Sequence, residues 1–410
     1  MEVLPKKYLL SYCLRVASWS TLALLIFTMG GCDFYANSET EEDPPLPKGS
    51  TLIASMDGNA PGLWLFDAET LERTAVVETE NHVPVGVAFS PSYERWYLSW
   101  STGSHLDGDA RNVLVALDPA EGGRFTKRAS WPDAPDVEGG VGNASLIYEP
   151  ANDHLVAYGS GSGRVQFFDP EALEPVRELS VGTSENSYVP AAAVAEKRKK
   201  IYFAVDTEGE RIYVYDTTEK ELNGAISLSD HPVLQESAFS DLAISMNERY
   251  LFGTTFLSPG GPGRFFVVDL ESGQIFFKGE AGNYSNLAVS PNGRYVYIDC
   301  PAGGALRQLP PTGQLLRFDV EQREMEVFVE DSEALGLGDY VLQATQITML
   351  PNAEAVVIRN RIGAEAGDPA LLKLDAETGS VLATYTLPRD DQDHATAWVR
   401  QLHFGVTASE

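Results

Sequence analysis

The sequence has few cysteines, few histidines and few basic residues. Its 410 residues include three cysteines, Cys13, Cys32 and Cys300, and no CxxC pair, which excludes a disulfide scaffold and a redox dithiol. The six histidines form neither HExxH nor a close pair, so we expect no zinc site. The 30 Lys and Arg stand against 59 Asp and Glu, a net charge of -29, which argues against a nucleic-acid partner. We predict no metal, no cofactor and no recognisable catalytic set.

The first 32 residues have the pattern of a secretory signal. Lys6, Lys7 and Arg15 precede an apolar run, residues 16–31, that ends directly before Cys32. This run is too short for a comfortable permanent transmembrane helix. The tetrapeptide at 29–32, MGGC, resembles the bacterial lipobox, which implies that residues 1–31 are removed and that Cys32 is lipidated. The alternative is an uncleaved anchor with an incidental cysteine.

Residues 32–50 then form the lipidated cysteine and a polar, acidic, Pro-rich linker with no apolar periodicity, which is typical of a flexible tether. The resemblance therefore predicts a lipoprotein anchored to a membrane of the bacterial cell envelope and facing the periplasm or the exterior. Its first partner is membrane lipid, through Cys32.

One pattern recurs through the remaining chain: an apolar run closed by aspartate. It recurs every 47 to 56 residues, from 169 to 216 at the shortest and from 319 to 375 at the longest, in seven copies that end at Asp67, Asp118, Asp169, Asp216, Asp269, Asp319 and Asp375. Aspartate at the start of a turn accepts backbone N–H bonds, and a glycine such as Gly273 supplies the positive φ that follows. We interpret the seven aspartates as turn residues.

A hairpin precedes most copies, as in NLAVSPNGRYVYID at 286–299. Four strands per unit of about 50 residues, repeated radially, predict an all-β fold, a seven-bladed β-propeller of four-stranded antiparallel blades. The segment 51–57 is a second strand without a first, and 399–406 is a first strand without a second. Their pairing is expected to close the ring, so that residues 51–408 form one domain. The stretches 288–298 and 266–274 resemble YVTN-type propeller repeats, a family that includes surface proteins, binding proteins and relatives of bacterial lactonases.

The long connections of this arrangement share one face, and examples are 130–143, 330–345 and 387–400. Long loops on a rigid scaffold are where binding usually resides. Aligning the starts of the first strands places a set of polar side chains at the mouth of the central channel. The candidates for ligand binding are Ser145, Asp241, Asn286, Gln346, Arg400 and Gln401. A hydrated channel without a ligand is the alternative for these residues.

Three functions are compatible with this arrangement. The first is a binding module whose long-loop face takes another envelope protein or a small extracellular ligand. The second is a hydrolase that resembles propeller lactonases and acts at the channel mouth, with Asp241, Arg400 and His82 as its candidates. The third is a purely architectural role as a rigid spacer. No family motif in the sequence assigns a catalytic residue.

Overall fold

The structure is a computed structural model that divides the chain into two units, residues 1–43 and 44–410. It describes residues 50–406 except 59–61, 79–82, 94, 103–110, 118–124, 132–143, 160–162, 183–186, 207–210, 229–230, 232–233, 235–236, 258–260, 283–284, 300–314, 330–343, 351–354, 361–369 and 388–396. Within these described residues, no helix is long and apolar enough to span a membrane. The predicted signal, Cys32 and most of the linker lie outside the described residues.

The described strands form seven four-stranded sheets with antiparallel neighbours. Three sheets follow the chain in its first half: β4 (Val83–Ser90), β5 (Arg95–Thr102), β6 (Arg111–Leu117) and β7 (Phe125–Trp131); β8 (Ala144–Glu149), β9 (His154–Gly159), β10 (Arg164–Phe168) and β11 (Pro175–Ser180); β12 (Tyr188–Ala195), β13 (Lys200–Asp206), β14 (Arg211–Asp216) and β15 (Glu221–Ser227).

Three more follow in its second half: β16 (Ser237–Ile244), β17 (Tyr250–Leu257), β18 (Gly261–Asp269) and β19 (Gln274–Ala281); β20 (Leu287–Val289), β21 (Tyr295–Asp299), β22 (Leu315–Asp319) and β23 (Glu324–Val329); β24 (Ala344–Met349), β25 (Ala355–Asn360), β26 (Ala370–Asp375) and β27 (Val381–Thr386). The prediction of an antiparallel propeller is confirmed.

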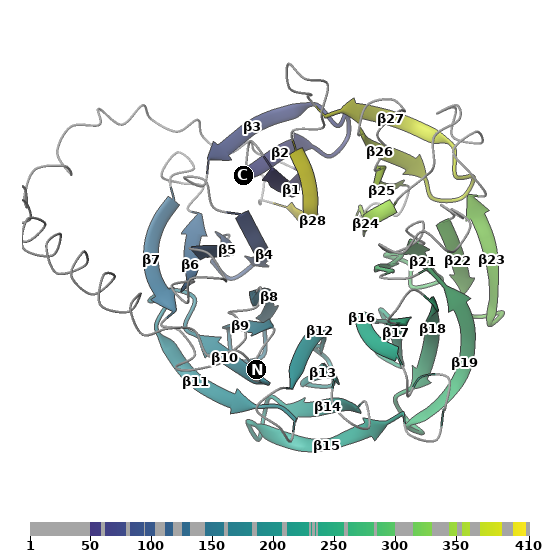
Figure 1. Cartoon of the computed structure of the whole chain (residues 1–410), viewed down its shortest axis with the longest axis horizontal. Helices are drawn as coiled ribbons and strands as arrows, with labels where there is room; N and C mark the ends of the chain where they lie inside the picture. The colour runs from purple at the N-terminus through teal and green to yellow at the C-terminus, as the bar shows by residue number, and fades with distance from the viewer. Residues whose placement is uncertain are drawn as a thin grey trace, which may run out of the picture. The chain divides into compact units, whose positions relative to one another are not determined.

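The last sheet combines the two ends of the second unit. Its order is β28 (Ala397–Val406), β1 (Ser50–Gly58), β2 (Gly62–Asp67) and β3 (Arg73–Glu78). The register of β1 and β28 runs from Ser50 opposite Val406 to Gly58 opposite Ala397. In Figure 1 the sheets surround a central space, with the first strand of each nearest the centre and the fourth at the periphery.

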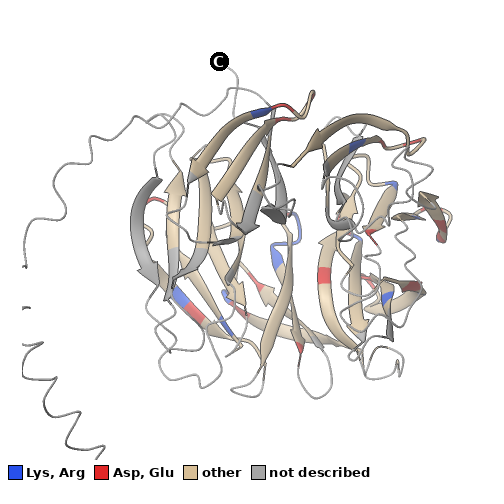
Figure 2. Cartoon of the chain, turned by 45° about the horizontal axis from the view of Figure 1, so that its top comes forward, with Lys and Arg blue, Asp and Glu red and all other residues tan. Residues whose placement is uncertain are grey.

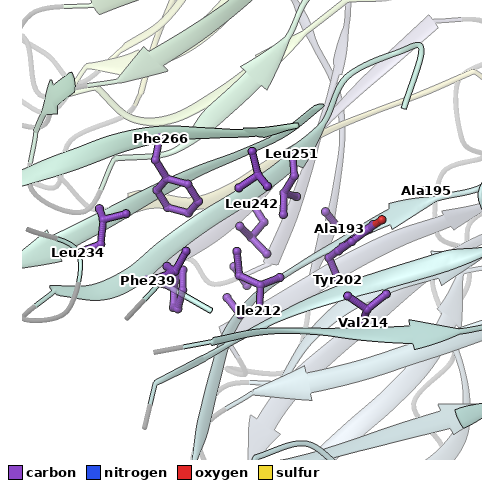
Figure 3. Close-up of a cluster of buried hydrophobic side chains, with 14 residues drawn as sticks. Ala193, Ala195, Tyr202, Ile212, Val214, Leu234, Phe239, Leu242, Leu251 and Phe266 are labelled. Carbon is purple, nitrogen blue, oxygen red and sulfur yellow. The ribbon is translucent and has the colours of Figure 1, made fainter. Parts of the chain in front are cut away.

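Among the described residues, the core consists of seven separate hydrophobic clusters, each of which draws its side chains from two neighbouring sheets. Figure 3 shows the cluster between the β12–β15 and β16–β19 sheets, where Ile212 and Tyr202 lie near Leu242 and Phe239. Another cluster joins the sheet of β1 to that of β24–β27 through Phe66 and Leu371. Burial of apolar area between sheets therefore holds the propeller together.

The repeated aspartates have the turn role that the sequence predicts. In each of the six that the structure describes, Oδ1 accepts two backbone N–H bonds, from the residues two and three positions later. These aspartates are Asp67, Asp169, Asp216, Asp269, Asp319 and Asp375. The N–H bond from Thr70 holds the pKa of Asp67 below its usual value, as hydrogen bonds to an ionised carboxylate do.

The left-handed residue of these turns differs from the sequence expectation. It lies four residues after the aspartate, and it is glycine only at Gly273 and Gly379 among the described turns. The other described turns place a side chain there: Leu71, Leu173, Lys220 and Arg323, with φ between 54° and 60°. Leu71 and Leu173 are 1% exposed and belong to two of the core clusters. Burial of their side chains offsets a backbone cost of about 1 kcal/mol.

The same turns connect neighbouring sheets. The carbonyl oxygen of the residue after the aspartate accepts a hydrogen bond from a side chain of the preceding sheet. The recorded bonds are Tyr97 Oη to Pro170 O at 2.9 Å, Asn152 Nδ2 to Thr217 O at 2.8 Å, Tyr297 Oη to Ala376 O at 2.6 Å and Lys373 Nζ to Ala68 O at 3.1 Å. In four of the six described turns, the aspartate thus fixes a turn whose carbonyl oxygen accepts a hydrogen bond from the preceding sheet.

Candidate functional site

The predicted channel-mouth residues all lie on or directly beside the first strands of their sheets. Ser145 is in β8, Asp241 in β16, Gln346 in β24, and Arg400 and Gln401 in β28, while Asn286 directly precedes β20. Most of the length of the described strands is drawn tan in Figure 2, so charged residues are the exception within them. The side chains of Gln346, Arg400 and Gln401 lie outside the described part of the structure.

Strand pairing is irregular in several first strands near the channel-mouth positions. The register shifts between Pro84 and Gly86 in β4, between Tyr188 and Ala191 in β12, and between Phe239 and Asp241 in β16. A bulge leaves backbone N–H groups without a ladder partner and changes the direction of nearby side chains. Carboxylates of neighbouring strands accept some of these N–H bonds.

Asp241 bridges two sheets from this position. Its Oδ1 accepts the N–H of Leu242 at 2.8 Å, and its Oδ2 accepts the N–H of Leu287, the first residue of β20, also at 2.8 Å. Burial raises the pKa of Asp241 to about 7, although the two N–H bonds lower it. Both carboxylate oxygens therefore already accept backbone N–H bonds. This structural role of Asp241 was not predicted from the sequence.

Asn286 and Asp299 form the next element of the site. Asp299 is fully buried at the end of β21, where its Oδ1 accepts the backbone N–H of Asn286 at 2.5 Å and its Oδ2 accepts Nδ2 of Asn286 at 2.9 Å. Burial, together with the charge of Asp241, raises the pKa of Asp299 well above its usual value. The amide of Asn286 is thus oriented by a carboxyl that solvent does not reach.

Ser145 faces a buried tyrosine. It pairs in register with Tyr158 of β9, which is 8% exposed. Burial raises the pKa of Tyr158, the charge of Asp241 adds to this, and hydrogen bonds from the Ser145 hydroxyl and the Ala192 N–H lower it. Ser145, Ala192 and Asp241 belong to three consecutive sheets, so the phenol of Tyr158 lies where these sheets meet.

Asp206 is a site residue that the sequence did not indicate. It ends β13 and is partly buried, and its Oδ1 accepts the N–H of Phe239 in β16 at 2.9 Å. Among the described residues, no donor is within hydrogen-bonding distance of its Oδ2. Burial raises the pKa of Asp206 to about 6, and the single N–H bond lowers it only in part. Asp206 is therefore ionised at neutral pH, and no described donor bonds its second oxygen.

The carboxyls do not assemble a metal site in the described part of the chain. No group of three His, Cys, Asp or Glu residues there is placed to hold a metal ion. Asp206 and Asp241 instead accept N–H bonds from successive sheets. The arrangement offers acid–base chemistry by carboxylates whose pKa values lie near neutrality.

No family model and no curated protein matches the sequence. Solved structures do match. The periplasmic gluconolactonase of Pseudomonas aeruginosa aligns with a TM-score of 0.60 at 15% identity, over 88% of this chain and 100% of that chain. A putative 6-phosphogluconolactonase from Bacteroides uniformis aligns with a TM-score of 0.60 at 13% identity, over 88% and 100%. The fold is a β-propeller.

Hydrazine synthase of Kuenenia stuttgartiensis also aligns with this propeller, with a TM-score of 0.52 at 16% identity over 72% of this chain and 77% of that chain. The three neighbours carry different names at similarly low identity. The likeness therefore shows the fold alone, and the function has to be argued from the site.

Proposed function

We propose that the propeller hydrolyses a small lactone at the end of the inner strands where Asp206 lies. The observation that supports this is the environment of the Asp206 carboxyl, whose pKa is raised to about 6. One of its oxygens accepts the Phe239 N–H, and no described donor bonds the other. A base with a pKa slightly below the working pH is ionised and still basic enough to assist proton transfer. The gluconolactonases among the structural neighbours favour a lactone as the substrate class.

In the proposed reaction, the Asp206 carboxylate takes a proton from a water molecule while the water oxygen bonds to the carbonyl carbon of the lactone. The carbonyl electron pair moves to its oxygen and returns as the ring C–O bond breaks. The proton on Asp206 then passes to the leaving ring oxygen, which becomes a hydroxyl group. The product is an open-chain hydroxy acid, and Asp206 is again a carboxylate.

The other channel-mouth residues are proposed to bind the ligand. Arg400 would supply positive charge for the developing oxyanion, and Asp241 would hold the two sheets on either side of the site in place. The remaining proposed ligand-binding residues are Ser145, Asn286, Gln346 and Gln401.

The test is hydrolysis of a lactone panel by the purified protein and by Asp206→Asn. Asparagine keeps an oxygen that can accept the Phe239 N–H but cannot take a proton. We expect the variant to lose at least about 100-fold in kcat, the usual contribution of a general base. Glu219→Gln, which neutralises an exposed carboxylate in a turn, is the matched control and should keep full activity. Wild-type protein that hydrolyses no lactone would refute the proposal.

The protein is further proposed to be a lipoprotein of the bacterial cell envelope, anchored through Cys32. The support is the signal pattern of residues 1–31 followed by MGGC. Cells grown with labelled palmitate should incorporate the label into the wild-type protein and not into Cys32→Ser. Equal labelling of both proteins would contradict this assignment.

A closed ring of seven blades is proposed for the propeller. The support is the pairing of β1 with β28, together with the hydrophobic cluster between their sheet and the β24–β27 sheet. Removing residues 397–406 should expose the edge of β1 and abolish cooperative unfolding. A truncated protein with unchanged stability would contradict the closure.

A protein-binding role remains the second candidate. The feature that favours it is the acidic character of the long loops, at 132–138, 330–333 and 390–393, all outside the described residues. Shortening 330–345 and 387–398 should remove a partner that is cross-linked in intact cells. Unchanged cross-linking would count against it.

A further inference from the structure

Tyr188 is an exposed aromatic residue on an inner strand. It begins β12 and is 37% exposed. The other large hydrophobic side chains that are exposed in the described part of the chain are aliphatic residues of the peripheral strands β11, β23 and β27 and Met246 of a turn. Among the described residues, an exposed aromatic residue on the first strand of a sheet therefore stands apart from the general surface pattern.

The neighbour of Tyr188 across the β12–β13 pair is Asp206. The two residues are partners in the register, a relation that places their Cβ atoms about 5 Å apart. Partial burial raises the pKa of Tyr188, and the charge of Asp206 adds to the effect. The ring and the carboxylate therefore interact, and both lie at the strand end next to the bulge of β12.

This pair also lies where two sheets meet. Asp206 is bonded to Phe239 of the next sheet, and the buried ring of Tyr158 in the preceding sheet is close enough for Tyr188 to raise its pKa. Val189, which follows Tyr188, is fully buried. The buried neighbour Val189 therefore fixes the backbone at Tyr188, while Tyr188 itself is exposed to solvent.

An aromatic face beside a carboxylate fits one class of ligand well. The face of the ring carries partial negative charge, which attracts the weakly positive C–H groups on the apolar side of a sugar ring. A carboxylate oxygen accepts strong hydrogen bonds from hydroxyl groups or from water. An aliphatic lactone lacks this face of axial C–H groups, so contact with the tyrosine ring adds little to its binding affinity.

We infer that Tyr188 is the stacking platform for the ring of a sugar lactone and selects sugar lactones over aliphatic ones. The inference rests on the proposed function, because it places the scissile ring over the Asp206 oxygen that does not accept the Phe239 N–H. Tyr188 is a specificity-determining residue in this account, and Asp206 remains the base.

The experiment compares Tyr188→Leu and Tyr188→Phe with the wild type on two substrates, glucono-δ-lactone and γ-butyrolactone. Tyr188→Leu removes the aromatic face but keeps an apolar side chain. We expect it to raise KM for glucono-δ-lactone about 10-fold, the value of one aromatic contact, with kcat nearly unchanged. The KM for γ-butyrolactone should not change, and Tyr188→Phe should behave as the wild type. Leu382→Ala, an exposed position on β27, is the control.

Binding of glucono-δ-lactam, a ring analogue that is not hydrolysed, is measured in parallel by saturation-transfer NMR. If the wild type hydrolyses neither lactone but binds the lactam in a Tyr188-dependent way, the inference stands and the proposed hydrolase function fails. If both lactones are hydrolysed and Tyr188→Leu changes neither KM, or changes both equally, the inference is overturned and the hydrolase function stands. Absence of both hydrolysis and lactam binding overturns the two together.

Discussion

Replacing Lys373 by methionine removes a buried cation that connects the β24–β27 sheet to the sheet that contains β1 and β28. Lys373 lies in β26 and is 9% exposed, and its Nζ donates to Ala68 O at 3.1 Å and to Glu69 O at 2.8 Å. Methionine has a similar length and keeps the apolar contacts of the lysine stem. The change therefore isolates the two hydrogen bonds between these neighbouring sheets.

The expected loss of stability depends on how well the two carbonyl groups are solvated after the substitution. Ala68 is 3% exposed, so its carbonyl oxygen would be left buried without this partner, at a cost of about 1–3 kcal/mol. Glu69 is exposed, and water can replace the ammonium there at little cost. Removal of a desolvated ammonium offsets part of the loss. We expect a net decrease of about 2 kcal/mol in the free energy of unfolding.

Urea unfolding followed by tryptophan fluorescence measures this difference. Lys278→Met is the matched control, because Lys278 is exposed and its bond to His231 lies on the surface; it should change stability by less than about 0.5 kcal/mol. A Lys373→Met protein as stable as the wild type, or a control that loses as much, would refute the reasoning that this junction is held by directed hydrogen bonds.

Two further predictions concern backbone strain and titration. Lys220 is exposed with φ of 59°, so Lys220→Gly should raise stability by roughly 1 kcal/mol, whereas Gly273→Ala at the equivalent turn position should lower it; calorimetric Tm values of the two variants should move in opposite directions. The raised pKa values of Asp206, about 6, and Asp241, about 7, mean that the folded state binds more protons than the unfolded state between about pH 4 and pH 7. The free energy of unfolding should therefore fall as pH rises through this range. Urea midpoints at pH 5, 6, 7 and 8 should show this decline, and Asp241→Asn should reduce its slope; a stability that rises over the same range would contradict the assignment.

The propeller could be predicted from the sequence because its signal is repeated. The apolar run closed by aspartate recurs with a nearly constant interval, and each aspartate acts locally on backbone two and three residues away, as at Asp375. A local interaction of this kind leaves a local pattern. The pairing of the segments around 51–57 and 399–406 could be predicted for the same reason, since each lacked a partner within its own repeat.

The left-handed turn residues show a limit of local inference. Leu173 occupies a conformation that favours glycine, and its side chain is buried in the cluster between two sheets. The backbone cost is small and packing offsets it, so the residue type there depends on tertiary contacts that the turn sequence does not contain.

Asp206 shows the same limit at the candidate site. Its hydrogen bond to Phe239 spans 33 positions in the sequence and lies beside the register shift in β16. Alignment of the first strands identified Asp241 but could not identify a residue at the end of a second strand. The pKa of Asp206 depends on burial at the junction of two sheets, and no short motif encodes that environment.

The most direct test of the proposed chemistry is the dependence of kcat/KM on pH for lactone hydrolysis, corrected for spontaneous hydrolysis. This quantity reports the ionisation of the free enzyme. We predict that kcat/KM rises from pH 4.5 and levels off above an apparent pKa of about 6, the value of Asp206, and that Asp206→Asn has low activity without this inflection. A flat profile in the wild type, or the same inflection in Asp206→Asn, would contradict the assignment of Asp206 as the base.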